Sequence, residues 1–221
     1  MLMNIARLAT RIAAGATATV LASVALGAPA QAHGKTKPLG TKSLAAVLTA
    51  DKSGFDRNSR DFDVLTAAVL AVLDAKPNSP VKVLTDGTVA LTAFVPNDGA
   101  FRQLAKEVTK KRSLPTEQQA FTTVAGLGID TVEAVLLYHV VPGATVDKKA
   151  ALKADGAKLT TAAGSKITVD VSRCWYRSPR VTLIDADRND RNAQVVVFDI
   201  NKGNKQIAHA VDRVLRPVDL P

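Results

Sequence analysis

The sequence predicts an α+β fold, in which helices come first along the chain and strands come later. Up to Pro142-Gly143, successive segments carry apolar residues at helical spacing behind residues that favour helix starts. After Gly143, β-rich runs alternate with turn residues. Regular alternation of strands and helices, which is typical of an α/β sheet, is not seen.

The clearest predicted helix covers residues 61–76, because its apolar residues fall on one face and Pro77 stops it. A short helix is expected over residues 43–50, with Ser43 as its N-cap. Next, residues 81–96 are interpreted as two strands joined at Asp86-Gly87. Asp-Gly favours a hairpin, since such turns need positive φ at both central residues.

Three further helices are predicted before Pro142. Either Asn97 or Asp98 can cap the first of them. Thr116 and Gln119 form a capping box for the second, and Asp130 and Glu133 have the same spacing for the third. The predicted strands after Gly143 cover residues 166–171, 180–185, 194–200 and 207–215. No internal repeat is seen, so one domain is expected over residues 43–217.

Residues 1–32 resemble a secretory signal peptide. A basic start with Arg7 and Arg11 precedes an apolar run, and small residues at Ala30 and Ala32 predict cleavage between Ala32 and His33. The apolar run is shorter than the about 20 residues of a membrane span, so no stable membrane anchor is expected. Residues 33–42 are polar and are interpreted as a flexible leader.

The charge indicates which partners the exported chain attracts. The chain carries 29 basic and 20 acidic residues, and the predicted signal peptide removes two Arg and no acid, which leaves +7. Such a protein is attracted to anionic cell-wall polymers, polysaccharides or lipid headgroups. Nucleic acid is not expected, because the basic residues are scattered. Their one cluster, residues 106–112, is interpreted as a solvated helix end.

The common catalytic and cofactor motifs are absent from the sequence, so no catalytic residue, cofactor or metal ligand is assigned. His139 lies in an apolar run and could be a catalytic base, a metal ligand or a hydrogen-bonded core residue. Its place at a helix end predicts the last of these, because an imidazole there can bond free carbonyls. Cys174 is the only cysteine and is expected to be buried. Trp175 is expected to pack in the core or at a strand edge, and a sugar-stacking or partner surface is the alternative.

The segment 185–192 imitates the start of a calcium-binding loop, because Asp185, Asp187 and Asn189 alternate. The sixth position is Asp190 rather than Gly, and the twelfth is Val196 rather than Glu. A polar turn is therefore predicted, and a weak extracellular cation site is the alternative.

Three blocks, in order, resemble the fasciclin (FAS1) domain family, in its secreted bacterial single-domain form. In residues 91–101, Thr92, Phe94, Pro96, Ala100 and Phe101 match the family's first block. Residues 136–143, LLYHVVPG, resemble its Tyr-His block, and residues 207–217 resemble its closing block. The likeness spans residues 43–217.

This resemblance implies a β-sandwich or wedge with helices packed along one edge. It also implies a secreted protein with no enzymatic activity, and retention at the cell wall is an alternative to free release. The implied role is adhesion, or interaction with an extracellular matrix, cell-wall or surface component, either protein or polysaccharide. An extracellular carrier of a small hydrophobic or carbohydrate ligand is the alternative, and a hydrolase that uses His139 is a third reading. Tyr138 and His139 are candidate interaction residues, because this block is linked to receptor contact in animal relatives.

Overall fold

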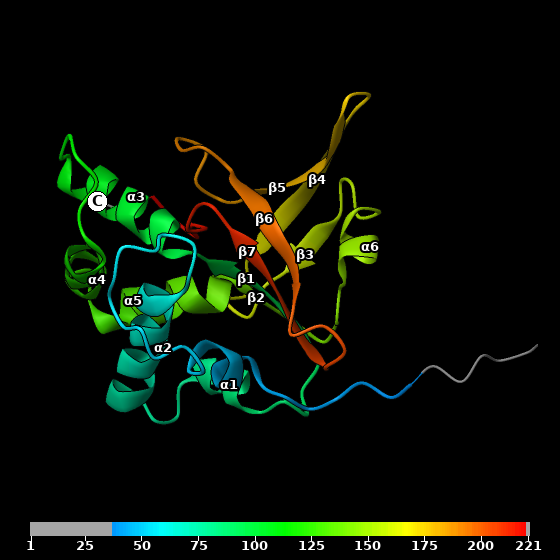
Figure 1. Cartoon of the computed structure of the whole chain (residues 1–221), viewed down its shortest axis with the longest axis horizontal. Coiled ribbons are helices and arrows are strands. Elements are labelled where there is room, and N and C mark those ends of the chain that lie inside the picture. Colours follow the sequence, from blue (N-terminus) through cyan, green and yellow to red (C-terminus); the bar gives the residue numbers. More distant parts are fainter. Residues whose placement is uncertain (1–36, 220–221) are drawn as a thin grey trace, which may run out of the picture. The chain divides into compact units, whose positions relative to one another are not determined.

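The computed structural model describes residues 37–219, in which all helices except the short α6 gather on one side of a sheet (Figure 1). The helices are α1 (Leu44–Leu48), α2 (Asp63–Ala75), the 3-10 helix η1 (Pro80–Thr85), α3 (Asp98–Thr109), α4 (Glu117–Ala125), α5 (Ile129–Tyr138) and α6 (Lys148–Ala151). The strands are β1 (Leu91–Pro96), β2 (Val140–Pro142), β3 (Lys158–Thr160), β4 (Lys166–Cys174), β5 (Arg177–Ile184), β6 (Ala193–Ile200) and β7 (Gln206–Val211). The predicted α+β class is confirmed. The signal peptide and the Ala32–His33 cleavage site lie outside the described residues.

The strands form one mixed sheet in the order β2-β1-β7-β6-β5-β4-β3. Among the seven strands of residues 37–219, β1 and β7 pair in parallel, with Ala93 opposite Ala208, and the other pairs are antiparallel. The sheet bends until its two ends approach each other. The Ala162 amide, just after β3, donates a hydrogen bond of 2.7 Å to the Val140 carbonyl in β2. The result is the nearly closed wedge that the family resemblance implied.

Alternation along β1 and β7 separates two hydrophobic cores. Ala93 and Val95, with Ala208 and Ala210, pack against the helices. The intervening residues face the inside of the bent sheet, where they meet the buried residues of β4 and β5. Because successive side chains point to opposite faces of a strand, β1 and β7 contribute residues to both cores. The inner core contains Phe94, Tyr138, Val141, Ile167, Val169, Val171, Val181, Leu183, Ala193, Val211 and Leu215.

The two residues that could cap α3 have separate tasks. The Asn97 side chain accepts a hydrogen bond of 2.9 Å from the Ala100 amide and caps α3. The buried Asp98 carboxylate instead accepts bonds of 3.0 and 2.9 Å from the amides of Asp63 and Val64. Asp98 therefore caps α2, whose own N-cap residue provides no side-chain bond.

One of the two predicted capping boxes is confirmed and the other is wrong. Thr116 and Gln119 make both reciprocal bonds at the start of α4. The α5 helix instead begins after Gly128, at φ 89°, with no side-chain cap. Glu133 is engaged elsewhere, since its carboxylate accepts bonds of 2.5 Å from both Lys76 and Ser79. A tertiary ion pair has therefore replaced the local box.

The predicted hairpin at Asp86-Gly87 is wrong. Its first run forms η1, because Pro80 fixes a helical φ at the first turn and Ser79 caps the Val81 amide at 3.2 Å. Asp86 then accepts a bond of 3.0 Å from the Thr88 amide, which makes a local turn. Strand β1 consequently takes its partners from distant parts of the chain.

The start of the domain and the end of β7 differ from the expected boundaries. Within the expected leader, the Gly40 amide donates to the Gly203 carbonyl at 2.8 Å, so ordered contacts begin before residue 43. Strand β7 ends at Val211. The Asp212 carboxylate then accepts a bond of 2.7 Å from the Gln194 amide.

Among residues 37–219, no single helix is long and apolar enough to cross a membrane. The pair α4 and α5 passes the length and composition criteria together, but it bends by 107° at its junction.

Candidate functional site

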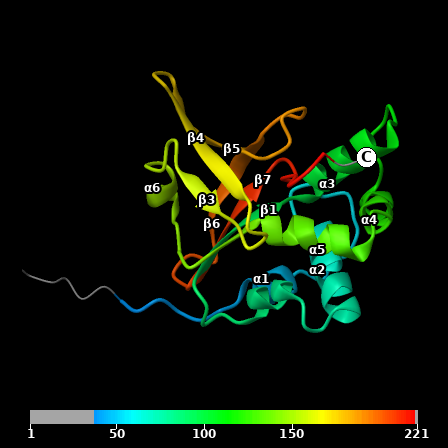
Figure 2. The same ribbon diagram turned by 180° about the vertical axis from the view of Figure 1, so that it is seen from behind.

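The β4–β5 hairpin extends beyond the strands on either side of it (Figures 1 and 2). Near its base, Val169, Val171 and Leu183 are buried in the inner core. The neighbours β3 and β6 pair with this base only, from residue 166 to 168 of β4 and at residues 182 and 183 of β5. Beyond Val171 the hairpin has no flanking strand, so the described side chains there are exposed to solvent.

Two adjacent aromatic residues form the end of this hairpin. Trp175 is 94% exposed and Tyr176 is 88% exposed. The prediction that Trp175 packs in the core or at a strand edge is therefore wrong, because none of the helices and strands within residues 37–219 lies beside this part of the hairpin. Exposure of so much aromatic area is uncommon in a side chain without a binding role. The expected burial of Cys174 concerns a side chain outside the described part of the structure.

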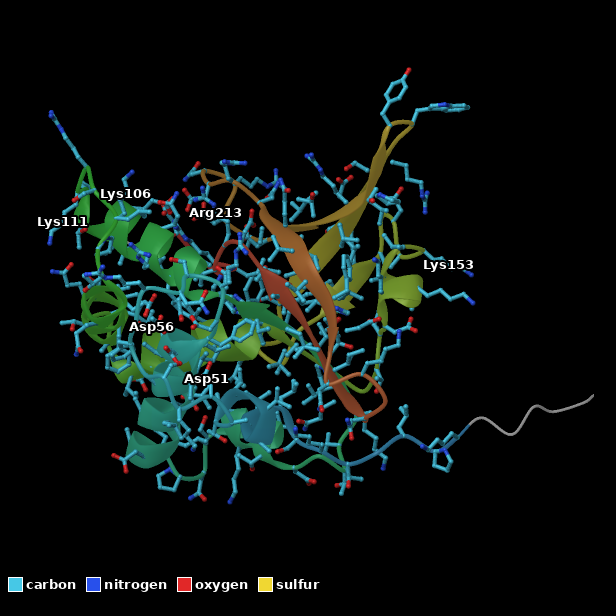
Figure 3. The ribbon with its side chains drawn as sticks, viewed as in Figure 1. Asp51, Asp56, Lys106, Lys111, Lys153 and Arg213 are labelled. Carbon is cyan, nitrogen blue, oxygen red and sulfur yellow. The ribbon has the colours of Figure 1, made fainter. Side chains whose placement is uncertain are left out.

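Basic side chains accompany the aromatic pair. Arg173 and Arg180 are exposed on the two strands of the hairpin. The Arg173 guanidinium donates a bond of 2.7 Å to the Leu152 carbonyl, which brings it beside the exposed Lys153 (Figure 3). We define the tip surface as Trp175 and Tyr176 at the end of the hairpin, with Arg173 and Arg180 on its two strands.

The candidate interaction residues of the LLYHVVPG block lie inside the protein. Tyr138 is fully buried, and its hydroxyl donates a bond of 3.1 Å to the Lys166 carbonyl. His139 is 4% exposed. Neither side chain is available to a partner at the surface, and the predicted burial of His139 is confirmed.

Both ring nitrogens of His139 are used within the fold. Nδ1 lies 2.7 Å from the Val135 carbonyl, so it carries the proton, and Nε2 accepts a bond of 2.9 Å from the Leu215 amide. Burial lowers the pKa of His139 to about 4, so the ring is neutral at neutral pH. The imidazole therefore joins the end of α5 to the closing segment and has no free nitrogen for acid-base chemistry.

The second buried histidine has the same kind of environment. His209 accepts a bond of 3.2 Å from the Asp199 amide at Nδ1, and its Nε2 lies 2.8 Å from the Val146 carbonyl. Burial lowers its pKa as well. Its ring packs against Phe94 and Phe198, with centroids 6.0 and 5.4 Å away.

An arginine occupies the centre of the segment that imitates a calcium loop. The Arg216 guanidinium pairs with Asp187, at 3.6 Å, and with Asp190. Asp185 accepts a bond of 2.9 Å from the Arg216 amide. Glu107 pairs with Arg216 and, at 2.6 Å, with Arg213. The protein's own cation thus neutralises these carboxylates, in agreement with the predicted polar turn.

The basic segment 106–112 lies at the end of α3 (Figure 3). Lys110 adopts a left-handed conformation with φ 53° and ends the helix. The interpretation of this cluster as a helix end is confirmed.

The comparison with known families agrees with these motifs. The fasciclin domain profile matches residues 65–217, which is more than half of the chain. The chain belongs to the fasciclin domain family. The fold of this fasciclin domain is also similar to a FAS1 domain pair from the insect cell adhesion molecule Fasciclin I, with a TM-score of 0.54 and 14% identity. That match covers 80% of this chain and 51% of the domain pair, so the chain spans about half the length of its structural relative. No curated protein is detectably similar to it in sequence.

The three blocks of this fasciclin domain that resemble the family are therefore structural elements. The first block provides β1 and both helix caps, the second joins α5 to the inner core, and the closing block provides β7. The tip surface lies outside all three blocks. The sequence analysis gave a partner surface at Trp175 only as the alternative to packing in the core. The signal that favoured exposure of Trp175 was its position between two predicted strands, among Arg, Ser and Pro residues.

Proposed function

We propose that this fasciclin domain is an extracellular, non-enzymatic protein that attaches to an envelope or matrix polymer through its tip surface. Fasciclin domains are typically extracellular and related to adhesion, which supports the general role. The observation that carries the proposal is the exposure of Trp175 and Tyr176 at the end of a projecting hairpin.

The chemistry of the tip surface favours an anionic polysaccharide as the partner. Flat aromatic rings can stack on the apolar faces of sugars, and arginines can pair with carboxylate or phosphate groups along the polymer. The net charge of +7 expected for the exported chain adds attraction to any anionic polymer, whatever the order of its sugars. Salt should therefore slow attachment, while loss of the aromatic pair should weaken it at any salt concentration.

Sedimentation with purified anionic cell-wall polysaccharide tests this proposal. The wild-type chain, exported through its own leader, should sediment with the polymer. The double variant Trp175→Ala/Tyr176→Ala should bind roughly 30-fold more weakly, the effect of about 2 kcal/mol expected for an aromatic hot spot. Leu70→Ala is the matched control, since Leu70 is an exposed apolar residue on α2, away from the hairpin. Equal binding by the double variant and the wild type would exclude the tip surface as the contact.

A pocket of about 310 Å³ supports the alternative role as a carrier of a small ligand. Its apolar wall includes Leu44, Leu48 and Phe62, and its polar residues include Asn58 and Arg60. This volume is at the lower end of the range for small-molecule sites. Native mass spectrometry of protein purified from its own host would detect a bound molecule as added mass, and protein at its bare chain mass would exclude a tightly held ligand.

A further inference from the structure

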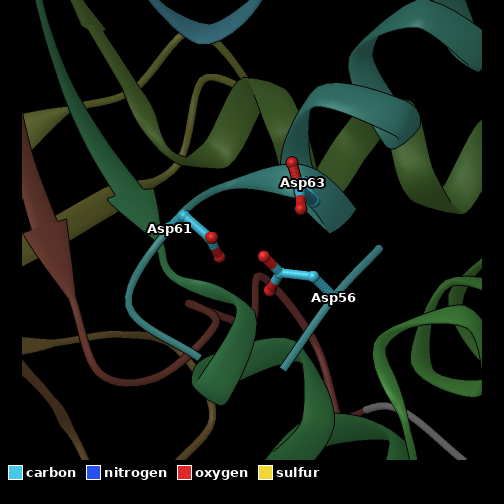
Figure 4. A group of neighbouring side chains, drawn as sticks. All are labelled: Asp56, Asp61 and Asp63. Atoms are coloured by element: carbon cyan, nitrogen blue, oxygen red, sulfur yellow. The ribbon is translucent and has the colours of Figure 1, made fainter. Parts of the chain in front are cut away.

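Five carboxylates from four segments converge beside the N-terminus of α2. Asp56 and Asp61 lie in the preceding loop, and Asp63, Asp98 and Glu117 are the first residues of α2, α3 and α4. Oxygens of Asp56, Asp61 and Asp63 lie within 4.8 Å of one another, and these side chains point toward a common centre (Figure 4). Asp61, Asp98 and Glu117 form an overlapping group at the same spacing.

Several of these oxygens are buried without a partner. Asp63 is only 9% exposed, and within the described residues no donor reaches its carboxylate, whose Oδ2 is fully covered. Glu117 is 1% exposed, and although its Oε2 accepts a bond of 2.6 Å from the Asp56 amide, its Oε1 has no partner. An unpaired buried carboxylate oxygen is costly. A positive partner within bonding distance would therefore stabilise these oxygens.

The helix starts and the nearby arginine do not supply that partner. A helix N-terminus favours an acidic residue in its first turn, but this effect leaves the oxygens of Asp63 and Glu117 without a donor. The Arg102 guanidinium is directed elsewhere, since it donates to the Ser59 hydroxyl at 2.5 Å and to the Pro115 carbonyl at 2.7 Å. By contrast, Arg216 enters the other acidic cluster directly.

We propose that Asp56, Asp61 and Asp63 bind a calcium ion, with the free oxygen of Glu117 as a further ligand. The donors are all carboxylate oxygens, which hard cations such as Ca²⁺ prefer, and two of the carboxylates come from a loop. Asp98 has both oxygens bonded to the start of α2, so it positions Asp63 and does not act as a ligand. Bound calcium would join the loop before α2 to the start of α4.

Thermal unfolding and calorimetric titration with CaCl₂ test the site independently of the proposed function. The exported chain is first treated with chelator and dialysed. Extracellular calcium modules bind in the range of about 0.1–1 mM, so 10 mM CaCl₂ should raise the melting temperature by about 4–8 °C. NaCl of equal ionic strength controls for screening, and the same concentration of MgCl₂ should give a smaller shift.

The variant Asp56→Asn/Asp63→Asn should lose the calcium-dependent shift and the heat of binding. It should still fold, because both substitutions keep the side-chain shape and remove repulsion, so its melting temperature in chelator should equal or exceed that of the wild type. Asp170→Asn, which removes an exposed acid on β4, is the matched control and should keep the full shift. No shift in the wild type, or an unchanged shift in the double variant, would overturn the site. An equal shift with MgCl₂ would overturn its assignment to calcium.

Discussion

Replacing His139 with alanine should strongly destabilise this fasciclin domain without involving any surface contact. The substitution leaves the Val135 carbonyl and the Leu215 amide without the partners they have at 2.7 and 2.9 Å. Each buried, unsatisfied backbone group costs about 1–3 kcal/mol, so we expect a total loss of about 2–6 kcal/mol. For a domain of this size, that loss corresponds to a melting temperature lowered by roughly 4–24 °C.

Urea unfolding measures this loss, and Tyr138→Phe is the matched control. It removes one hydroxyl bond of 3.1 Å in the same buried block and should cost about 1 kcal/mol. If His139→Ala costs no more than Tyr138→Phe, the imidazole is not the link between α5 and the closing segment that we describe.

The pH dependence provides a second, independent check on His139. Its pKa is lowered from 6.5 to about 4, so between these values the unfolded chain binds the proton more readily than the folded protein. The stabilising contribution of the neutral ring is therefore complete above pH 6.5 and is lost as pH falls toward 4. The difference in unfolding free energy between wild type and His139→Ala should shrink by roughly 2–3 kcal/mol from pH 7.5 to 4.5. A difference that stays constant would show that the ring is protonated or exposed.

Three further predictions follow from the charged groups and one cap. In chelator, the unfolding free energy of Asp63→Asn minus that of the wild type should increase as pH rises from about 4 to 6, because the raised pKa of Asp63 means that its ionised form destabilises the folded state. Urea unfolding at each pH measures this difference, in which the opposite contribution of His139 cancels, and a constant difference would contradict the repulsion. Arg216→Met should cost about 3–5 kcal/mol in the same assay, because it leaves the buried charge of Asp187 unpaired, and a loss under 1 kcal/mol would show that the network is solvated. Thr116→Ala should lower stability by about 1 kcal/mol through loss of the capping box, and a neutral result would mean that α4 is held by packing alone.

Local signals predicted the elements whose structure is decided locally. The apolar face and Pro77 located α2, and Thr116 with Gln119 located the start of α4. The β-rich run predicted over residues 207–215 located β7, although the strand ends at Val211. The buried role of His139 was also predictable, since a histidine at a helix end has a carbonyl within reach.

Errors arose where distant segments decide the outcome. Asp86-Gly87 has the composition of a hairpin turn, but Ser79 and Pro80 start a 3-10 helix and the partners of β1 come from β2 and β7. Glu133 had the spacing for a cap and instead pairs with Lys76.

The candidate sites were harder to predict than the fold for the same reason. The exposure of Trp175 depends on how far β3 and β6 extend along the hairpin, which no local pattern records. In the acidic cluster, Asp56, Asp61 and Asp63 are close in sequence, and Asp61 and Asp63 were assigned only to the predicted helix over residues 61–76. Glu117 reaches them only because α4 packs against α2, so the unpartnered oxygens become visible only in three dimensions.

The parallel pairing of β1 with β7 determines the order in which this fold can be completed. The first strand of the domain lies beside the last one, and β7 is also the only link between β1 and β6. Because the closing segment is synthesised last, a nascent chain that ends before residue 206 cannot assemble the central strands. Contacts between residues so far apart in sequence also form slowly. The domain should therefore stay unfolded until its whole length has been made, so that folding begins only after synthesis of β7.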